Sequence, residues 1–364
     1  MKVKIGDITK IKTGKLDANA SSEDGEYPFF TCSKEPLRIS TYSYDCECVL
    51  VAGNGDLNVK YYNGKFDAYQ RTYIIEDNSD GRLFMPYLYY FMEGYVEELR
   101  KQAIGGVIKY IKLGNLTDAM IELSDVEIQK KIVNILSKTK GVLDSRSHQI
   151  DMLDNLIKAR FVEMFGDENN SKNWDIVNVE EVAEVQVGVV IKPSQYYTDE
   201  SNGIRAFRSL NIGAGYIKDN DWVYFTEEGN QKNSKSIVKE NDLLIVRSGA
   251  PGTACVVTGE YAGYNAIDII IAHPNCEKVN PYYLCTFTNM PHGKKQIEEG
   301  TGGAAQQHFN VGKYNKLLLM MPPKSLQDEF VDFVRQVDKS KVVVQKAFDE
   351  TQMLYDSLLQ EFFG

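Results

Sequence analysis

Polar side chains that can hydrogen-bond to base edges and phosphates gather on glycine-containing stretches of this chain. Arg pairs with guanine through two hydrogen bonds and Asn or Gln with adenine, while Ser, Thr, Lys and backbone amides hold phosphates. Residue type and spacing alone do not separate DNA binding from protein binding or from solvated loops. The candidate DNA-binding residues are Ser33, Lys34, Asn54, Asn58, Lys60, Tyr61, Tyr69, Gln70, Arg71 and Lys109 in the first half of the chain, and Lys192, Arg205, Arg208, Ser209, Asn211, Arg247, Ser248, Asn265, Gln306 and Gln307 in the second.

Sequence motifs of catalytic chemistry are weak or missing. Asn280-Pro281-Tyr282-Tyr283 resembles the Asn-Pro-Pro-Tyr loop of amino-methyltransferases, but the second Pro is missing and no glycine-rich cofactor loop accompanies it, which favours a plain helix start. The sequence contains no GxxxxGK[ST] loop for nucleotide phosphates and no Glu-x-Lys nuclease element. Its four histidines have no metal-ligand or triad spacing. We therefore expect a chain that is not an enzyme and that holds no cofactor or metal.

The candidate residues must be positioned by a scaffold, and the sequence indicates one that occurs twice. A long helical pattern at 128–166 returns at 326–364 without a gap, at a constant offset of 198 that matches Gln129 with Gln327. Such self-similarity is the signature of an internal repeat. The chain therefore carries two copies of one supersecondary unit.

Apolar residues recur every seven positions within each helical pattern, with a second row three or four residues away. This a/d spacing over about five heptads predicts two helices that pair as a coiled coil. About 38 residues rise roughly 57 Å, too long for a small domain without a partner helix. Arg146, Arg160 and Lys341 interrupt the rows, and we expect antiparallel pairing. The predicted pairing residues are Ile132, Leu136, Leu143, Ile150, Leu153, Ile157, Phe330, Val334, Val337, Val344, Phe348, Tyr355 and Leu358.

The segments before the two helices are also duplicated. The stretch that begins at Lys4 matches the one that begins at Asn178, at offset 174, and short strand-like runs separated by Asn-Gly and Asp-Gly turns follow. We pair Pro86 with Pro281, and Tyr69-Gln70 with Tyr264-Asn265. The predicted fold class is α+β, with two similar mostly-β domains, each followed by a long helix. The predicted boundaries are 1–125, 126–166 (helix), 167–173 (linker), 174–324 and 325–364 (helix).

Composition narrows the class of protein. The net charge is −10, and residues 1–125 and 167–324 each carry 15 basic and 19 acidic side chains, so any DNA contact must use a local basic surface or a basic partner. The sequence has no run of 18 apolar residues, and its amino terminus begins in a strand-like pattern. We therefore expect a cytoplasmic protein with no signal peptide and no membrane span. The six scattered cysteines are expected to be reduced thiols.

The whole chain resembles the specificity subunits of type I restriction–modification systems. The resemblance rests on the repeated unit, on the openings at Lys4 and Trp174, on the helices that begin near Gln129 and Gln327, and on the stretch from Asp242 to Gly249. The first domain lacks a counterpart of Arg247-Ser248-Gly249, with Gly53-Asn54-Gly55 in its place. The architecture carries the resemblance, because no single motif is specific to the family.

The resemblance implies a function and a set of partners. Each domain would be a target recognition domain that reads one half of a bipartite sequence in double-stranded DNA, and the helices would set the spacing. Two adenine methyltransferase subunits with S-adenosylmethionine would dock on the chain, and an ATP-dependent restriction subunit would join them. Two alternatives stay open: the specificity subunit of a related type II restriction-methylation enzyme, or a two-headed protein-interaction scaffold with a coiled-coil spacer.

Overall fold

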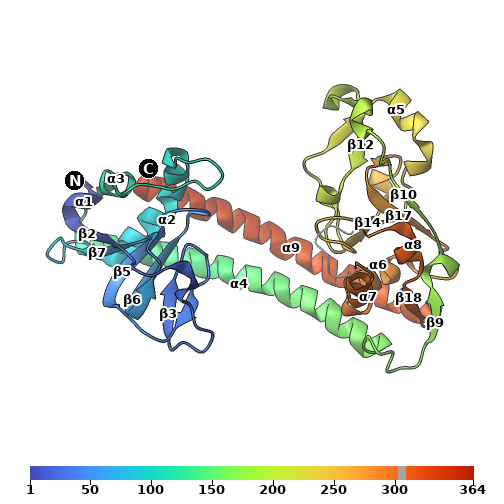
Figure 1. Ribbon diagram of the computed structural model, residues 1–364, viewed down its shortest axis with the longest axis horizontal. Coiled ribbons are helices and arrows are strands. Elements are labelled where there is room, and N and C mark those ends of the chain that lie inside the picture. The colour runs from blue at the N-terminus through green and yellow to red at the C-terminus, as the bar shows by residue number, and fades with distance from the viewer. Residues whose placement is uncertain (302–308) are drawn as a thin grey trace. The chain divides into compact units, whose positions relative to one another are not determined.

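The computed structural model describes residues 1–301 and 309–364, whose elements are labelled in Figure 1. The chain divides into two compact units: unit 1 is Met1–Gln149 with Val343–Gly364, and unit 2 is Ile150–Val342. Two helices of 40 residues, α4 (Val126–Phe165) and α9 (Lys324–Phe363), contribute to both units. The predicted α+β class is confirmed: a β-rich domain precedes each long helix.

Unit 1 is built around a six-stranded sheet in the order β2-β7-β5-β6-β3-β4, antiparallel except for the parallel pair β3 and β6. A separate antiparallel ribbon of β1 and β8 lies beside it. The strands are β1 (Lys2–Lys4), β2 (Thr9–Thr13), β3 (Tyr27–Phe30), β4 (Leu37–Ile39), β5 (Tyr44–Ala52), β6 (Val59–Ala68), β7 (Thr72–Asp77) and β8 (Met120–Glu122). The helices are α1 (Ile5–Ile8), the 3-10 turn η1 (Ala18–Ala20), α2 (Met85–Gln102) and α3 (Leu113–Thr117).

Unit 2 contains two four-stranded sheets, β10-β17-β14-β15 and β11-β13-β12-β16, and the antiparallel ribbon β9-β18. The strands are β9 (Asp175–Asn178), β10 (Ala183–Val187), β11 (Tyr197–Thr198), β12 (Ile204–Phe207), β13 (Val223–Phe225), β14 (Leu243–Val246), β15 (Ala254–Val256), β16 (Asn265–Ala266), β17 (Ile269–Pro274) and β18 (Leu318–Met321). The helices are α5 (Glu227–Lys232), α6 (Pro281–Asn289), α7 (Pro291–Thr301) and α8 (Val311–Asn315), with 3-10 turns η2 (Val179–Glu181), η3 (Pro193–Tyr196), η4 (Glu200–Asn202), η5 (Ser209–Asn211), η6 (Ser234–Ser236) and η7 (Gly259–Tyr261).

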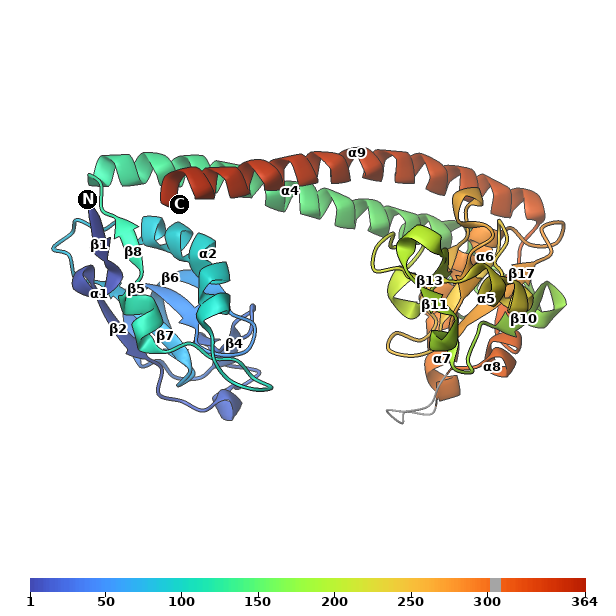
Figure 2. The same ribbon diagram turned by 90° about the horizontal axis from the view of Figure 1, so that it is seen from above.

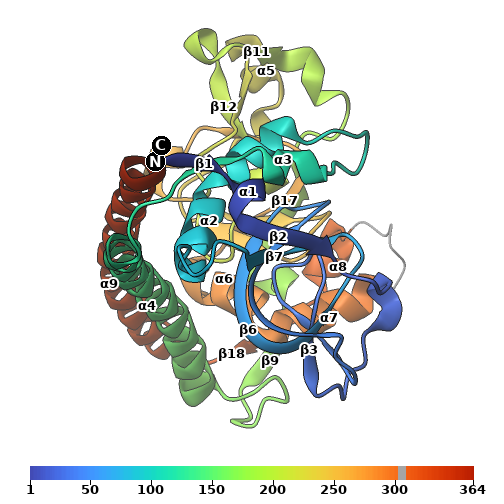
Figure 3. The same ribbon diagram turned by 90° about the vertical axis from the view of Figure 1, so that its left-hand side faces the viewer.

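The second half of β5 and the whole of β14 are buried on both faces, and both are continuous apolar runs. Successive side chains of a strand point to opposite faces. In β5, Val49 and Val51 pack into the core that includes α2, whereas Leu50 packs into a second core on the other face. In β14, Leu243 and Leu244 divide between two cores in the same way. Figure 3 shows α2 between the sheet of unit 1 and the long helices.

A buried glutamine near the start of each long helix demonstrates that the repeat is structural. The Gln129 side chain accepts a hydrogen bond from the Phe84 backbone N–H at 2.8 Å and donates to two backbone carbonyls. The Gln327 side chain accepts from the Asn280 N–H at 2.9 Å and donates to the Pro322 carbonyl. Both glutamines are fully buried. Each one fixes its long helix to the residue that precedes α2 or α6.

These hydrogen bonds correct one of the predicted pairings. Because Phe84 and Asn280 bond to equivalent glutamines, Pro86 corresponds to Tyr282, and the predicted match of Pro86 with Pro281 is wrong by one residue. Proline is tolerated at either of the first two positions of a helix, where its missing N–H has no helical acceptor. The position of a proline in the sequence therefore does not show which residues of the two first turns correspond.

Replacing Gln129 by Ala is expected to lower the free energy of unfolding by about 3 kcal/mol, because buried backbone groups lose their partners. Urea denaturation of the full chain measures this. Gln149→Ala is the matched control, since Gln149 is an exposed glutamine of the same helix. Equal losses in the two variants would show that the buried hydrogen bonds of Gln129 do not stabilise the fold.

Within each unit, the segments of the two long helices lie side by side and pair in antiparallel orientation, as predicted (Figure 2). In unit 1, Leu136 and Leu143 of α4 pack in one cluster with Tyr355 of α9. In unit 2, the ring of Phe330 near the start of α9 lies 5.4 Å from those of Phe161 and Phe165 near the end of α4. Early residues of one helix therefore meet late residues of the other.

The polar residues that interrupt the apolar rows bond across the helix pair. Within unit 1, Arg146 donates to the Ala347 carbonyl and, at 2.6 Å, to the Thr351 hydroxyl. Within unit 2, Lys341 pairs with Asp154 at 2.6 Å, and Arg160 pairs with Glu329 at 3.3 Å. Because each bond requires one alignment of the two helices, these residues define the pairing register.

A polar cluster joins α2 to both long helices inside unit 1. Lys140 of α4 forms an ion pair with Glu93 of α2, and the Tyr355 hydroxyl of α9 donates to Glu93 at 2.5 Å. The Tyr89 hydroxyl donates to the same carboxylate at 3.1 Å. Burial, reinforced by the Glu93 charge, raises the pKa of Tyr89 to about 12. The phenol is therefore neutral at physiological pH and remains a hydrogen-bond donor.

Candidate nucleic-acid interface

Four loops meet at one end of the unit 1 sheet, and we call residues 31–36, 53–58, 69–71 and 103–112 loop cluster 1. The Gly53 N–H donates to the Arg71 carbonyl at 2.8 Å, and the Gly55 N–H donates to the Lys109 carbonyl at 3.0 Å. The Asn58 amide donates to the Cys32 carbonyl at 2.8 Å. Backbone and side-chain hydrogen bonds thus join all four loops into one surface, although they are far apart in the sequence.

Loop cluster 1 brings together most of the candidate residues of the first half. Lys60 and Tyr61 are in β6, next to the cluster, and Tyr69 is half-buried at its edge. Asn54 and Asn58 are half-buried within it. The remaining candidates are exposed on the cluster: Ser33, Lys34, Gln70, Arg71 and Lys109. Whether these residues touch DNA stays a prediction.

Several of these side chains already have partners within the chain. Gln70 donates to the Asp17 carboxylate at 2.8 Å, and Tyr61 donates to Glu47 at 2.7 Å. Burial and the bond to Glu47 raise the pKa of Tyr61 to about 12. The Lys60 ammonium donates to the side-chain oxygen of Asn58, and burial lowers the pKa of Lys60. Asn58 and Lys60 therefore position the loops, whereas Arg71 and Lys109 present cations without an ion-pair partner among the described residues.

The equivalent end of unit 2 holds Arg247 at its centre. The Arg247 guanidinium forms an ion pair with Asp268 and donates to the Phe309 carbonyl at 3.2 Å. The Phe309 N–H in turn donates to the Arg247 carbonyl at 3.2 Å, just as the Ile111 N–H donates to the Gly53 carbonyl in unit 1. Gly53-Asn54-Gly55 therefore occupies the position of Arg247-Ser248-Gly249. The two units present different side chains at the same place in the fold.

The Asp268 carboxylate was missed at the sequence level. Asp268 is a non-glycine residue with φ of +49°, a conformation that Asp and Asn adopt more readily than most residues. It lies at offset 198 from Gln70, which is the signal that could have identified it. The ion pair leaves the Arg247 side chain only 16% exposed. Base contact by Arg247 would therefore require it to share or exchange its bond with Asp268.

Lys192, Arg205, Arg208 and Ser209 lie on or beside the second sheet of unit 2. Lys192 is exposed with φ of +44°, at the start of η3. Arg205 pairs with Asp219 at 3.2 Å, and its guanidinium lies 5.4 Å from the centre of the Trp222 ring. Arg208 donates to the Asp221 carbonyl, and Ser209 begins η5. The two arginines are therefore half-buried and partly engaged within the unit.

Two candidate asparagines are buried and stabilise the fold. The fully buried Asn211 accepts from the Arg208 N–H at 2.9 Å and donates to the Asn220 carbonyl at 2.7 Å. Asn265 is also fully buried, and it accepts from the Ala266 N–H at 3.0 Å and donates to Asn230 at 2.9 Å. Their amides stabilise turns, so neither one presents its side chain to a ligand in this conformation.

Asn265 also corrects the second predicted pairing. Ala206 pairs with Asn265 in a parallel bridge, as Phe29 pairs with Asp67 in unit 1. Asn265 therefore corresponds to the buried Asp67, and the predicted match of Tyr264-Asn265 with Tyr69-Gln70 is wrong by three residues. The prediction matched the two segments because each contains a Tyr followed by an amide residue. Strand pairing does not require this short pattern, so the pattern does not show which residues correspond.

Two candidates fall outside the part of the chain that the structure describes, and the described part contains no candidate metal site and no membrane-spanning helix. Gln306 and Gln307 lie outside the described residues. Within residues 1–301 and 309–364, no group of His, Cys, Asp and Glu could hold a metal ion, and no helix is both long and apolar enough to cross a membrane. The six cysteines are free thiols.

Comparison with known proteins identifies the family. The family model of the type I restriction modification DNA specificity domain matches residues 1–151 and 171–347. The specificity subunit of the Escherichia coli type I restriction enzyme EcoDI is 36% identical over 156 residues, which are 43% of this chain and 34% of that protein. The EcoBI specificity subunit of the same organism is 21% identical over 316 residues, 79% of this chain and 66% of that protein. The matched region thus spans about one third of the EcoDI subunit and just under two thirds of the EcoBI subunit.

Solved structures share the fold. The S subunit of a type I restriction-modification system from M. genitalium is 17% identical with a TM-score of 0.59, and the alignment covers 100% of this chain and 96% of that one. A chain from a study of complex assembly and conformational transition in the type I R-M system is 14% identical with a TM-score of 0.54, covering 100% and 97%. With its two β-rich domains and paired helices, this chain belongs to the type I restriction modification DNA specificity domain family.

Proposed function

We propose that the chain is the DNA-recognition subunit of a type I restriction–modification complex and is not itself an enzyme. In this proposal, unit 1 and unit 2 each read one half of a bipartite target in double-stranded DNA. Catalysis, S-adenosylmethionine and ATP belong to the partner subunits. The complex acts in the cytoplasm.

The observation that supports this proposal most is that one scaffold holds two different loop surfaces. The buried glutamines and the backbone bonds at Gly53 and Arg247 are equivalent in the two units. At those equivalent places unit 1 presents Gly53-Asn54-Gly55 and unit 2 presents Arg247-Ser248-Gly249. A domain fold that is repeated with different loops suits a protein that recognises two different DNA sequences with two similar domains.

The long helices have two roles in this function: they space the two domains and dock the partner subunits. A helix of 40 residues rises about 60 Å, more than one turn of duplex DNA at about 34–36 Å. Large side chains of α4 that the pairing leaves exposed, Ile128, Ile135 and Val142, recur every seven residues. Such a stripe suits a further helical partner. We assign it to two adenine methyltransferase subunits, which an ATP-dependent restriction subunit would join.

The acidic chain is expected to bind DNA well only with its partners. Mixing the full chain with candidate methyltransferase subunits should give a stable complex that retards one duplex sequence more than scrambled DNA at fixed salt. The chain alone should show weak retardation, because its net charge of −10 opposes contact with phosphates. A complex that forms but never prefers one sequence would contradict DNA recognition and favour a protein-interaction scaffold.

A further inference from the structure

Two apolar side chains project from the tip of the longest loop in loop cluster 1. Val107 is 104% exposed and Ile108 is 63% exposed, and they stand between Gly105-Gly106 and Lys109. Scattered exposed apolar residues are normal on protein surfaces. An adjacent pair at the tip of a constrained loop differs from such scattered residues, because the loop conformation keeps both side chains in contact with water.

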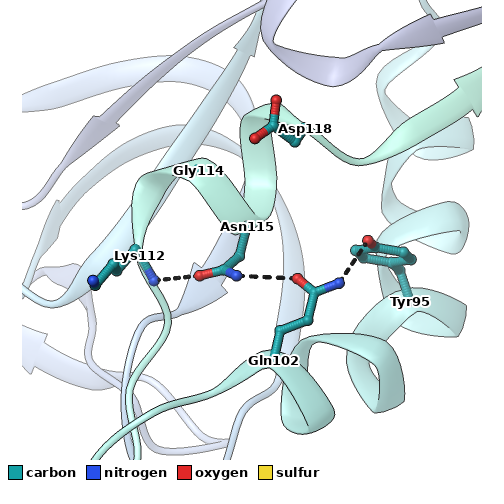
Figure 4. A pocket seen from close by; sticks show the side chains of 6 residues that line it. All are labelled: Tyr95, Gln102, Lys112, Gly114, Asn115 and Asp118. Atoms are coloured by element: carbon teal, nitrogen blue, oxygen red, sulfur yellow. Dashed lines mark hydrogen bonds between the residues drawn. The ribbon is translucent and has the colours of Figure 1, made fainter.

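The base of the loop is closed by a chain of hydrogen bonds that lines an open pocket (Figure 4). The Asn115 side-chain amide in α3 donates to the side-chain oxygen of Gln102, at the end of α2, at 3.1 Å. The Lys112 backbone N–H donates to the side-chain oxygen of Asn115 at 2.7 Å, and the Gln102 side-chain amide donates to the Tyr95 hydroxyl at 3.4 Å. The two ends of the loop are thus fixed to each other and to α2.

The tip itself has a defined backbone. Ile104 and Tyr110 exchange two backbone hydrogen bonds of 3.0 and 2.8 Å, which close a small hairpin. Gly105 has φ of +127°, and a Cβ at this position would lie 2.6 Å from the Ile108 carbonyl oxygen. Only glycine fits there. The hairpin therefore requires Gly105 and presents Val107 and Ile108 outward.

The hairpin is also attached to the candidate interface. The Lys109 carbonyl accepts from the Gly55 N–H at 3.0 Å, and the Ile111 N–H donates to the Gly53 carbonyl at 2.9 Å. The Tyr73 hydroxyl donates to the Ile111 carbonyl at 3.2 Å. The apolar tip thus belongs to the same surface as Asn54.

The charged residues of loop cluster 1 and the apolar tip together suit a polyanionic ligand that also carries a small apolar group. Lys34, Arg71 and Lys109 are exposed, and none of them has an ion-pair partner in residues 1–301 or 309–364. Lys109 follows the tip directly in the sequence, and Lys34 and Arg71 lie on other loops of loop cluster 1, in a chain whose net charge is −10. A stable protein interface buries roughly 800 Å² on each partner, more than two side chains flanked by polar loops supply. The charges and the narrow tip therefore favour a nucleic-acid groove over a protein.

We propose that Val107 and Ile108 read thymine by contacting its 5-methyl group in the major groove of the half-site bound by unit 1. The thymine methyl is the apolar group on the major-groove edges of the four bases. Arg71 and Lys109 hold the neighbouring phosphates. This inference rests on the proposed function, and it makes these two residues determinants of sequence specificity. Each methyl group buried against them should contribute about fourfold in affinity.

The test compares thymine with deoxyuridine, which lacks only the methyl group. The full chain, in complex with the methyltransferase subunits with which it purifies, first selects a duplex from a random pool. Thymines of the selected duplex are then replaced by deoxyuridine one position at a time. Wild type should lose about fourfold in affinity at one or two thymines of one half-site. The double variant Val107→Ser with Ile108→Ser should bind the thymine and deoxyuridine duplexes equally.

The matched control is Val190→Ser with Ile191→Ser, which changes an exposed apolar pair of unit 2, 50% and 80% exposed. This control should keep the deoxyuridine sensitivity in the half-site of unit 1. Both double variants should unfold at the wild-type temperature, because the substituted side chains are exposed.

Three outcomes would overturn the inference, and they are distinguishable. A wild-type complex that selects a sequence but is indifferent to deoxyuridine excludes methyl readout. A Val107/Ile108 variant that keeps the sensitivity but loses the methyltransferase subunits assigns the tip to a protein contact. A wild-type complex that selects no sequence overturns the proposed function, and with it this inference.

Discussion

Exchanging residues 15–120 for the corresponding segment of another member of the family is expected to change one half of the methylated DNA motif and leave the other half unchanged. The expectation follows from the separate cores of the two units. The clusters around Val49 and Leu50 contain only residues of unit 1, and those around Leu243 and Leu244 contain only residues of unit 2. A new unit 1 should therefore leave the loops of unit 2 intact.

The design of this exchange must respect the contacts that α2 makes with the long helices. Tyr89, Tyr90 and Glu93 fall within the exchanged segment, yet they pack against or bond to α4 and α9. The hybrid should retain these three residues. Sequencing of methylated adenines in cells that carry the hybrid gives the motif. The reciprocal exchange of residues 189–318 should alter the other half, and a change in both halves, or in neither, would contradict independent reading.

Removing one heptad from both long helices is expected to bring the two half-sites closer together. Deleting Leu143–Gln149 from α4 and Lys346–Gln352 from α9 shortens each helix by about 10 Å. Seven residues are nearly two full turns, so the remaining apolar rows rotate by only about 20°. At about 3.4 Å per base pair along the duplex, the gap between half-sites should shrink by up to about three base pairs.

The two deletions are matched so that the register of the helix pair is kept. They remove Arg146 together with both of its partners on α9, Ala347 and Thr351. On one side of the deletions the cluster of Lys140, Glu93 and Tyr355 remains, and on the other side the ion pair of Asp154 and Lys341 remains.

Deletion from α4 alone is the control, because it makes the two helices unequal in length. This single deletion should abolish assembly with the methyltransferase subunits, which co-purification measures. Unchanged half-site spacing in a double-deletion complex that still methylates DNA would show that the helices do not set the distance.

The sequence allowed the scaffold to be predicted because the scaffold depends on periodic apolar residues. Leu136 and Leu143 at heptad spacing required a partner helix, and the second copy of the pattern supplied it. The match of Gln129 with Gln327 was visible in the sequence, although its meaning became clear only from the buried hydrogen bonds. The repeat at a fixed offset therefore predicted the repeated fold correctly.

The loops were harder to predict because their conformations depend on contacts distant in sequence. Asn265 has the residue type of an adenine reader, yet strand pairing buries it beside Ala206. Arg247 has the residue type of a guanine reader, yet Asp268 shares its guanidinium. Conversely, Val107 and Ile108 lack polar groups and were not candidates at the sequence level. Their exposure depends on the hairpin closed by Ile104 and Tyr110.

We propose that the two units read two separate halves of one DNA target. Methylated adenines can be mapped across the genome of cells with and without this chain, in the presence of its methyltransferase partners. We expect methylation that depends on the chain to fall on one bipartite motif, with two defined blocks separated by a fixed number of unspecified base pairs. Methylation at a single continuous motif, or methylation that is the same without the chain, would contradict it.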